Sequence, residues 1–325
     1  MRSIRRAVTA AVLTWLLAAG AVPVAAGEQA PVPYVSGAGK LIVERAPGDW
    51  SVVADDVWGV SPLSFENHYF AEVSNGVCAA DQSGLIAVAR VDALTGTREL
   101  LGDGGNPMLS WDGRHLAYTG IDCESVSNQR QFRLVIRDVV TGVEVDFATP
   151  VGESSEGPGG WVEPVSWAAD SRHLVVQVGS IGPPGISPEF WYLDARSTEL
   201  AFVGHRLPQL DHGRGPYGLA ALGTSGEWVA VVSAKGGKGP VRIVTYDVER
   251  ATSDRVLGRV PAAKERGAAA LIRILSDPAG SALLMLVGEE NFASSLYELD
   301  VATEKTRLLY GPDAVHAGWL IPASS

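Results

Sequence analysis

The sequence predicts an all-β fold, a six-bladed β-propeller in which each blade is a four-stranded antiparallel sheet. Three observations support this prediction. Glycine and proline are frequent, with 37 and 19 residues in a chain of 325, as is usual where many short strands are joined by turns. A strand–turn–strand pattern recurs along the chain, and an aspartate-containing turn follows each copy at a similar period. Helical periodicity is weak after the first 26 residues.

The first 26 residues have the pattern of an export signal. Three arginines precede an apolar run over residues 7–22, and small side chains lie at the positions before Ala26, after which we expect cleavage. The predicted organisation is a signal peptide over residues 1–26 and a single propeller domain over residues 27–325. An uncleaved anchor is the alternative, and the choice between general secretion and twin-arginine export stays open.

Composition and charge exclude several classes of protein. Apolar residues make up 46% of the chain, which excludes a disordered protein. The 37 acidic residues outnumber the 26 basic ones, for a formal net charge of −11, which argues against a nucleic-acid partner. Loss of the signal peptide removes three arginines and no acid. No later stretch is apolar enough to span a bilayer, so the mature chain is predicted to be extracytoplasmic without a membrane span.

The first recurring marker is a polar turn between two strands. Its clearest copy is Ser-Trp-Asp-Gly-Arg-His-Leu-Ala-Tyr at 110–118, and related stretches occur before and after it. Most copies offer Gly or Asn for a left-handed turn residue. The turn positions follow one another at intervals of 46 to 58 residues and are Asn67, Gly113, Ser171, Gly226 and Gly280.

The second marker is a turn that begins with aspartate and reads Asp-x-x-Thr-Gly at 92–96 and 138–142. A short carboxylate can accept backbone N–H groups within such a turn, and glycine supplies the left-handed residue. The marker aspartates lie 46 to 56 residues apart and are Asp92, Asp138, Asp194, Asp247 and Asp300. Two markers that keep one period predict repeated four-stranded blades.

The repeat divides the mature chain into five complete blades and one blade built from both ends. The five blades are expected over residues 57–102, 105–150, 162–204, 215–258 and 270–310. Residues 34–56 and 312–322 would together form the sixth blade, with the C-terminal segment as its innermost strand. Closure of this kind removes open sheet edges. Seven blades are the minor alternative.

The motif at 110–118 resembles the Ser-Pro-Asp-Gly-x-x-Leu-Ala-Phe/Tyr signature of TolB-like propeller repeats, and the turns at 92–96 and 138–142 fit the same family. The resemblance covers nearly all of the mature chain, but the signature aspartate is not evident in the fourth and fifth blades. Because these motifs are turn residues, the resemblance implies the fold. It also implies a protein-binding scaffold, by analogy with the family.

Cys78 and Cys123 are the two cysteines of the chain. In an oxidising compartment two cysteines more often pair than stay free, and both fall in predicted loops of adjacent blades. We therefore expect a disulfide between them, with two buried thiols as the alternative.

Candidate binding residues lie in two places. Asp211, His212 and Arg214 join an acid, an imidazole and a guanidinium in one predicted loop between blades. Glu163 and Arg273 lie at or near the start of innermost strands, so they could meet a ligand in the central channel. Other reactive residues are better explained as turn or surface residues, including the paired positions His115 and His173 at strand starts.

The sequence therefore predicts an exported, non-catalytic propeller that binds a protein, peptide or cell-wall glycan through its loop-rich face. No catalytic residue, metal ligand or cofactor is predicted. The alternative is a metal-dependent hydrolase or lactonase with its site in the central channel, for which acidic or amide groups would have to converge there.

Overall fold

A computed structural model gives the fold, and all of its regular structure in the described residues is β-strand. No described segment forms a helix long and apolar enough to cross a membrane. The residues that the structure describes are 32–37, 40–55, 59–65, 67–74, 86–122, 131–147, 161–182, 185–195, 204–206, 219–222, 228–233, 242–247, 250, 252–260, 271–288, 294–311, 314 and 316–321.

Eleven strands pair into one long sheet in the order β10-β9-β8-β7-β6-β5-β4-β23-β1-β2-β3. Its strands are β1 (Val32–Gly37), β2 (Lys40–Ala46), β3 (Asp49–Asp55), β4 (Leu63–Phe65), β5 (His68–Ser74), β6 (Ile86–Asp92), β7 (Arg98–Leu109), β8 (His115–Asp122), β9 (Gln131–Asp138), β10 (Glu144–Phe147) and β23 (His316–Ile321).

Three further sheets have four strands each, paired in chain order. The first contains β11 (Trp161–Trp167), β12 (His173–Gly182), β13 (Gly185–Asp194) and β14 (Gly204–Arg206). The second contains β15 (Leu219–Leu222), β16 (Trp228–Ser233), β17 (Arg242–Asp247) and β18 (Thr252–Arg259). The third contains β19 (Leu271–Ser276), β20 (Ala282–Gly288), β21 (Ser294–Asp300) and β22 (Lys305–Tyr310).

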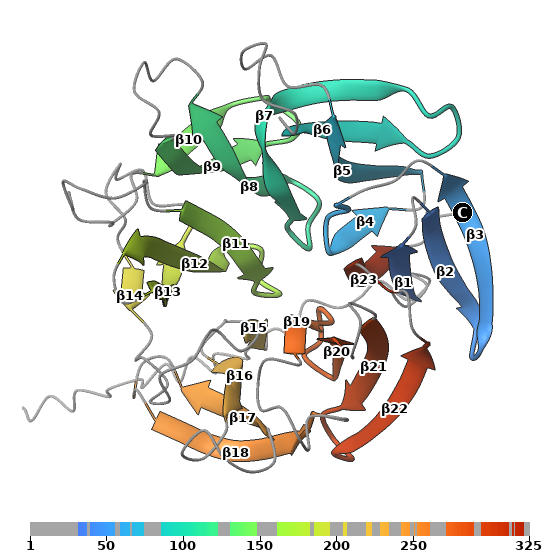
Figure 1. The fold of residues 1–325 in the computed structure, drawn as a ribbon, viewed down its shortest axis with the longest axis vertical. Helices are drawn as coiled ribbons and strands as arrows, with labels where there is room; N and C mark the ends of the chain where they lie inside the picture. The colour runs from blue at the N-terminus through green and yellow to red at the C-terminus, as the bar shows by residue number, and fades with distance from the viewer. Residues whose placement is uncertain are drawn as a thin grey trace, which may run out of the picture.

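The sheets stand around a common centre, as Figure 1 shows. Strands β4, β11, β15, β19 and β23 lie nearest this centre, together with the end of β7, whereas β3, β18 and β22 lie at the rim. Contacts between β11 and β15, between β15 and β19, and between β7 and β11 join the separate sheets on their inner side. The first strand of each four-stranded group is thus the strand that faces the centre.

The two ends of the chain meet in the long sheet. The C-terminal strand β23 pairs antiparallel with β1, with Trp319 opposite Pro33, and β1 continues into β2 and β3. Within residues 34–56, which were expected to contribute to the sixth blade, β2 and β3 form an antiparallel hairpin. Sequence reasoning missed β1, which lies between this hairpin and the C-terminal strand.

The long sheet differs from the separate blades that the sequence predicted. One reason is β7, whose first half pairs with β6 and whose second half pairs with β8. The strand turns from one neighbour to the other at Gly104, which has φ 145°, and a Cβ there would lie 1.9 Å from the carbonyl oxygen of Thr119. The other reason is the parallel pairing of β23 with β4, with Trp319 opposite Leu63.

The expected turn residues occupy equivalent places in three repeats. Gly113, Ser171 and Gly280 all have left-handed backbone, with φ of 69°, 54° and 67°. Each N–H donates to the carbonyl three residues earlier, at distances between 2.9 and 3.1 Å. The alignment of the first marker in these repeats is therefore confirmed, although Ser171 adopts a conformation that glycine tolerates better.

Inner strands of the sheets are buried on both faces, as β20 shows. Five consecutive residues of β20, Leu283–Val287, are all buried, which a strand wetted on one face would not allow. Hydrophobic side chains of neighbouring sheets pack together, as Met108 and Leu134 do with Leu174 and Val176. The stacking of sheets against each other is thus what makes apolar runs without alternation stable.

Candidate site at the centre of the ring

Three innermost strands place a polar side chain at a corresponding level. Asn106 of β7, Glu163 of β11 and Arg273 of β19 each lie four or five residues before the start of the following turn. Asn106 and Glu163 both precede a proline, and the strand register shifts beside each proline. Proline lacks an N–H to give to a ladder, so a bulge accommodates it.

Glu163 and Arg273 form an ion pair, with 3.1 Å between Arg273 Nη2 and Glu163 Oε1. These are two of the residues that the sequence singled out, and 110 positions separate them. Their side chains are 28% and 21% exposed, so water reaches them although they lie on innermost strands. The structure brings the two residues together, and their role toward a ligand stays a prediction.

Glu72 on β5 is the second carboxylate of the site. Its Oε1 accepts the backbone N–H of Asn106 at 2.6 Å. Asn106 has φ 55°, an uncommon conformation for a residue other than glycine. Gly59, with φ 52°, leaves room for the carboxyl group, because a Cβ on it would lie 2.6 Å from Glu72 Cδ. Two left-handed residues thus fix the position of one carboxylate.

The surroundings raise the pKa of Glu72 above its ordinary value. Burial is the largest cause, and the negative charge of Glu163 acts in the same direction. The N–H group of Asn106 and the charge of Arg273 oppose it. Glu72 therefore shares an electrostatic environment with both members of the ion pair.

His316 at the start of β23 completes the group. Burial, followed by the positive charge of Arg273, lowers its pKa to about 4, so its imidazole is neutral at pH 7. Nearby, the Tyr34 hydroxyl donates to the carbonyl of Ser61, and burial raises the pKa of Tyr34. From here on, Glu72, Asn106, Glu163, Arg273 and His316 are called the central cluster.

The binding residues predicted in a loop between blades, and the two cysteines, lie in segments that the structure does not describe. Asp211, His212 and Arg214 lie outside the described residues, as do Cys78 and Cys123. Their predicted roles in ligand binding and in a disulfide therefore stay predictions.

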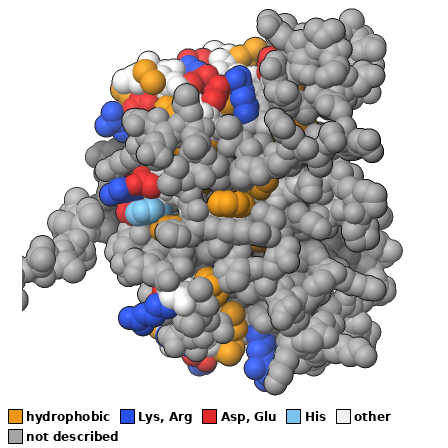
Figure 2. All heavy atoms as spheres, turned by 90° about the vertical axis from the view of Figure 1, so that its left-hand side faces the viewer, with side chains coloured by type: hydrophobic (Ala, Val, Ile, Leu, Met, Phe, Trp, Pro, Cys, Tyr) orange, Lys and Arg blue, Asp and Glu red, His pale blue; other side chains and the backbone are white. Residues whose placement is uncertain are grey.

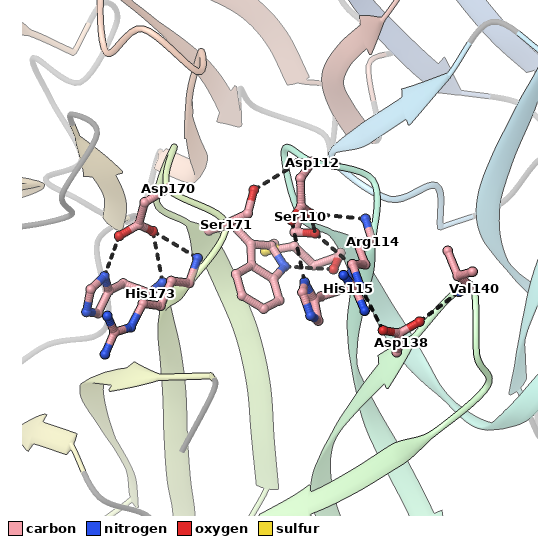
Figure 3. Close-up of polar contacts among 12 residues, drawn as sticks. Ser110, Asp112, Arg114, His115, Asp138, Val140, Asp170, Ser171 and His173 are labelled. Atoms are coloured by element: carbon pink, nitrogen blue, oxygen red, sulfur yellow. Dashed lines mark hydrogen bonds and ion pairs between the residues drawn. The ribbon is translucent and has the colours of Figure 1, made fainter. Parts of the chain in front are cut away.

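His115 and His173 are the first residues of β8 and β12, directly after the turns that Figure 3 shows. His173 Nδ1 lies 2.6 Å from Asp170 Oδ2, and its ring stacks on Tyr192 with 5.2 Å between ring centres. His115 lies 6.2 Å from the ring of Trp167. These contacts support the interpretation of both histidines as residues that cover a strand start.

The turns around these histidines also connect the two sequence markers. Arg114 Nε donates to Asp138 Oδ2 at 2.9 Å, and Asp138 Oδ1 accepts the N–H groups of Val140 and Thr141 (Figure 3). These donors hold the pKa of Asp138 well below its usual range. Arg172 and Asp194 repeat the ion pair in the next sheet. The expected role of the marker aspartate is confirmed in this turn.

Charged side chains on the outer strands lie in mixed groups. Figure 2 shows acidic and basic side chains next to one another on the side of the molecule that carries β10 and β14. The β9–β10 pair contains two such ion pairs, Arg133 with Asp146 at 2.6 Å and Arg137 with Glu144 at 2.7 Å. Such exposed pairs contribute little to stability and mark a solvated surface.

Within the described ranges, no group of three or more His, Cys, Asp or Glu residues is arranged to hold a metal ion. The central cluster supplies two carboxylates, a guanidinium, an amide and a neutral imidazole. These groups can donate and accept hydrogen bonds and can balance charges of either sign. Ligand pockets use a small number of polar groups of these kinds to orient a ligand.

Sequence reasoning missed Glu72, Asn106 and His316. Glu72 is the one charged residue within the otherwise uncharged stretch Tyr69–Val73. A charged residue in a buried strand is rare, so this position could have been marked as a candidate functional residue. Asn106 could have been found from the Asn-Pro pair that parallels Glu163-Pro164. No comparable signal marks His316, because its place depends on how the two ends of the chain meet.

No protein-family model and no curated protein sequence matches the chain. Among solved structures, TolB from Acinetobacter baumannii superposes with a TM-score of 0.57 at 14% identity, over 91% of this chain and 68% of that protein. The putative TolB from Agrobacterium tumefaciens has a TM-score of 0.54 at 12% identity, over 89% of this chain and 92% of that one. The tricorn protease has a TM-score of 0.50 at 10% identity, over 89% of this chain and 34% of that protein. At these identities the likeness is one of fold, and the fold is that of a TolB-like β-propeller.

Proposed function

We propose that the chain is an exported six-bladed propeller that binds a protein, peptide or cell-wall glycan. Six groups of four strands account for the described strands when β7 is counted in two groups. The order β23-β1-β2-β3 within the long sheet supports a sixth blade built from both chain ends. The domain boundaries are those predicted from the sequence, with the signal peptide ending at Ala26.

The observation that carries the binding proposal is the Glu163–Arg273 pair beside Glu72. Glu163 and Arg273 are each the third residue of their strands, close to the end that follows a connection between blades. Those connections lie on the loop-rich face in this architecture, so the central cluster opens toward that face. Binding sites commonly form from loops mounted on a rigid ring.

The proposal is tested by capture of a partner with matched variants. Immobilised wild-type protein and the double variant Glu163→Gln/Arg273→Gln are incubated with extracellular proteins and cell-wall fragments of the source organism. A component that the wild type retains and the folded variant loses supports the proposal. Equal retention by both proteins contradicts a binding role for the central cluster.

The alternative is a metal-dependent hydrolase or lactonase in the central channel. Two carboxylates and an amide oxygen in the central cluster are the observation that favours it. A metal that binds the native state tightly must raise the melting temperature Tm. No shift of Tm with saturating calcium or zinc would remove this alternative.

Two further elements of the proposal have direct tests. Cleavage after Ala26 predicts that the exported protein begins at Gly27, which N-terminal sequencing measures. The disulfide between Cys78 and Cys123 predicts no alkylation of the unreduced protein, which intact mass measures. A mass increase for two alkylated thiols before reduction would contradict the disulfide.

A further inference from the structure

The central cluster carries one more carboxylate than cations. Glu163 is paired with Arg273 at 3.1 Å, which leaves Glu72 as the remaining acid. Within the described part of the chain, no lysine or arginine forms an ion pair with Glu72, and its carboxylate accepts a hydrogen bond from the Asn106 N–H. With His316 neutral, the fully ionised cluster has one net negative charge at pH 7.

Two residues with left-handed backbone determine where the Glu72 carboxyl group lies. Gly59 provides the space beneath the carboxyl group, and the left-handed backbone of Asn106 turns its N–H toward Oε1. Residues held in sparsely populated backbone conformations concentrate at ligand and active sites. A half-buried carboxylate that two such residues hold, and that has no cation beside it among the described residues, can accept a cationic group of a ligand.

Glu72 lies close enough to Glu163 and Arg273 for their charges to act on it, and both carboxylates keep an oxygen that can accept a further donor. Glu72 Oε2 has no donor among the described contacts, and Glu163 has a second carboxylate oxygen beyond the one facing Arg273. The Asn106 amide nitrogen lies 3.5 Å from the Thr119 hydroxyl, which leaves its amide oxygen as an acceptor among the described contacts. An ammonium group has three donors and no acceptor.

We propose that Glu72, Glu163 and the Asn106 side chain bind a primary ammonium group, with Arg273 holding Glu163 in place. The inference rests on the proposed binding function and names the chemistry of its ligand. Two sources share this chemistry, the free N-terminus of a peptide and a lysine side chain. Either is carried on a chain that can continue over the loop-rich face.

The charges that act on Glu72 are those of Glu163 on β11 and Arg273 on β19. Arg273 in turn acts on two further titratable groups, His316 on β23 and Tyr34 on β1. Among them Arg273 is the one cation at pH 7, and it is already paired. Binding of an ammonium beside Glu72 favours its ionised form, so at mildly acidic pH binding should release a proton.

Calorimetric titration of the whole protein tests the assignment with three probes. They are trialanine amide with a free N-terminus, N-acetyl-trialanine amide, and N-acetyl-lysine amide. We expect the acetylated trialanine to bind at least tenfold more weakly than an amine-bearing probe. A preference between the two amines identifies the source, and tetramethylammonium chloride controls for charge without N–H donors.

The decisive variant is Glu72→Gln, which can still accept the Asn106 N–H and should stay folded. It should weaken binding of the amine probes at least tenfold, whereas the exposed Glu99→Gln should bind like the wild type. At pH 5, titrations in buffers of different ionisation enthalpy should show proton release for the wild type and none for Glu72→Gln.

Equal binding of free and acetylated peptides, no binding of either amine, or wild-type affinity in Glu72→Gln would each overturn the ammonium assignment. A rise of Tm with calcium that Glu72→Gln abolishes would overturn it in favour of a metal. None of these outcomes affects partner capture by the Glu163–Arg273 pair, so failure of this inference is distinguishable from failure of the proposed function.

Discussion

Gly318 lies on the C-terminal strand β23, which joins the part of the long sheet that ends in β4 to the part that begins with β1. It is opposite Tyr34 of β1, while the next residue, Trp319, donates its N–H to the carbonyl of Pro62 at 2.7 Å. A Cβ at Gly318 would lie 2.1 Å from that same carbonyl oxygen and 2.6 Å from Tyr34 Cε1. Gly318→Ala therefore cannot be accommodated by rotation of one flexible side chain.

The cost follows from the two contacts that must change. Overpacking of a filled core costs about 1–3 kcal/mol, and loss of the Trp319–Pro62 hydrogen bond adds about 0.5–1.5 kcal/mol. We expect a total of about 2–4 kcal/mol. For domains of 150–250 residues, each kcal/mol lowers Tm by about 2–4 °C, and larger chains lie at the low end. The expected fall in Tm is thus roughly 4–8 °C.

Gly311→Ala is the matched control, because nothing lies within 4 Å of a Cβ at that position. Its stability should stay within about 0.5 kcal/mol of the wild type. The assay is thermal unfolding by far-ultraviolet circular dichroism, supported by urea unfolding at 25 °C. Equal melting of the two variants would refute the description of β23 as a strand packed tightly between β1 and β4.

Three other changes test separate parts of the structure. Trp167→Phe removes a buried indole hydrogen bond of 2.9 Å to the Met108 carbonyl and should cost about 1–3 kcal/mol in urea unfolding; no loss would contradict this contact between neighbouring sheets. Asp138→Asn should lower Tm at pH 7, because N–H donors and Arg114 depress the pKa of this carboxyl below its ordinary 3.8. Stability from a depressed carboxyl pKa is present above the ordinary value and is lost as the pH falls, so the difference from wild type should shrink between pH 5 and pH 2. His316→Gln should flatten the stability profile between pH 6.5 and 4, because the folded pKa of about 4 lies below the ordinary 6.5 and the unfolded chain binds the proton first; an unchanged slope would show that His316 is not buried.

The turns were the most predictable part of the fold. Gly113 and Gly280 could be placed from sequence because a left-handed turn residue favours glycine, and Asp138 because a short carboxylate caps a turn. The fifth repeat lacks an aspartate at the signature position, and Asp277, three residues before Gly280, accepts the backbone hydrogen bonds instead. Asp277 precedes the turn and accepts the N–H groups of Ser281 and Ala282 at 2.7 and 3.0 Å. A local signal therefore predicts local structure even where its position drifts.

Features that depend on distant contacts were not predictable in the same way. The sequence could not show that β7 serves two neighbours, because that depends on Gly104 packing against Thr119 of β8. Strand β1 was missed because its partner β23 is at the opposite end of the chain. The position of Glu72 depends on Gly59 and Asn106, and no signal in the sequence shows that these two residues contact Glu72.

The central cluster occupies the places where the repeats differ. Turn residues recur because every blade needs the same turn, so their similarity between repeats is explained by the fold and not by function. Asn106, Glu163 and Arg273 lie at a corresponding level of three innermost strands, yet one is an amide, one an acid and one a base. The left-handed backbone at position 106 favours asparagine, whereas the backbone does not require an acid at position 163 or a base at position 273. Under the proposed binding function, the acid at 163 and the base at 273 would face distinct groups of an asymmetric ligand.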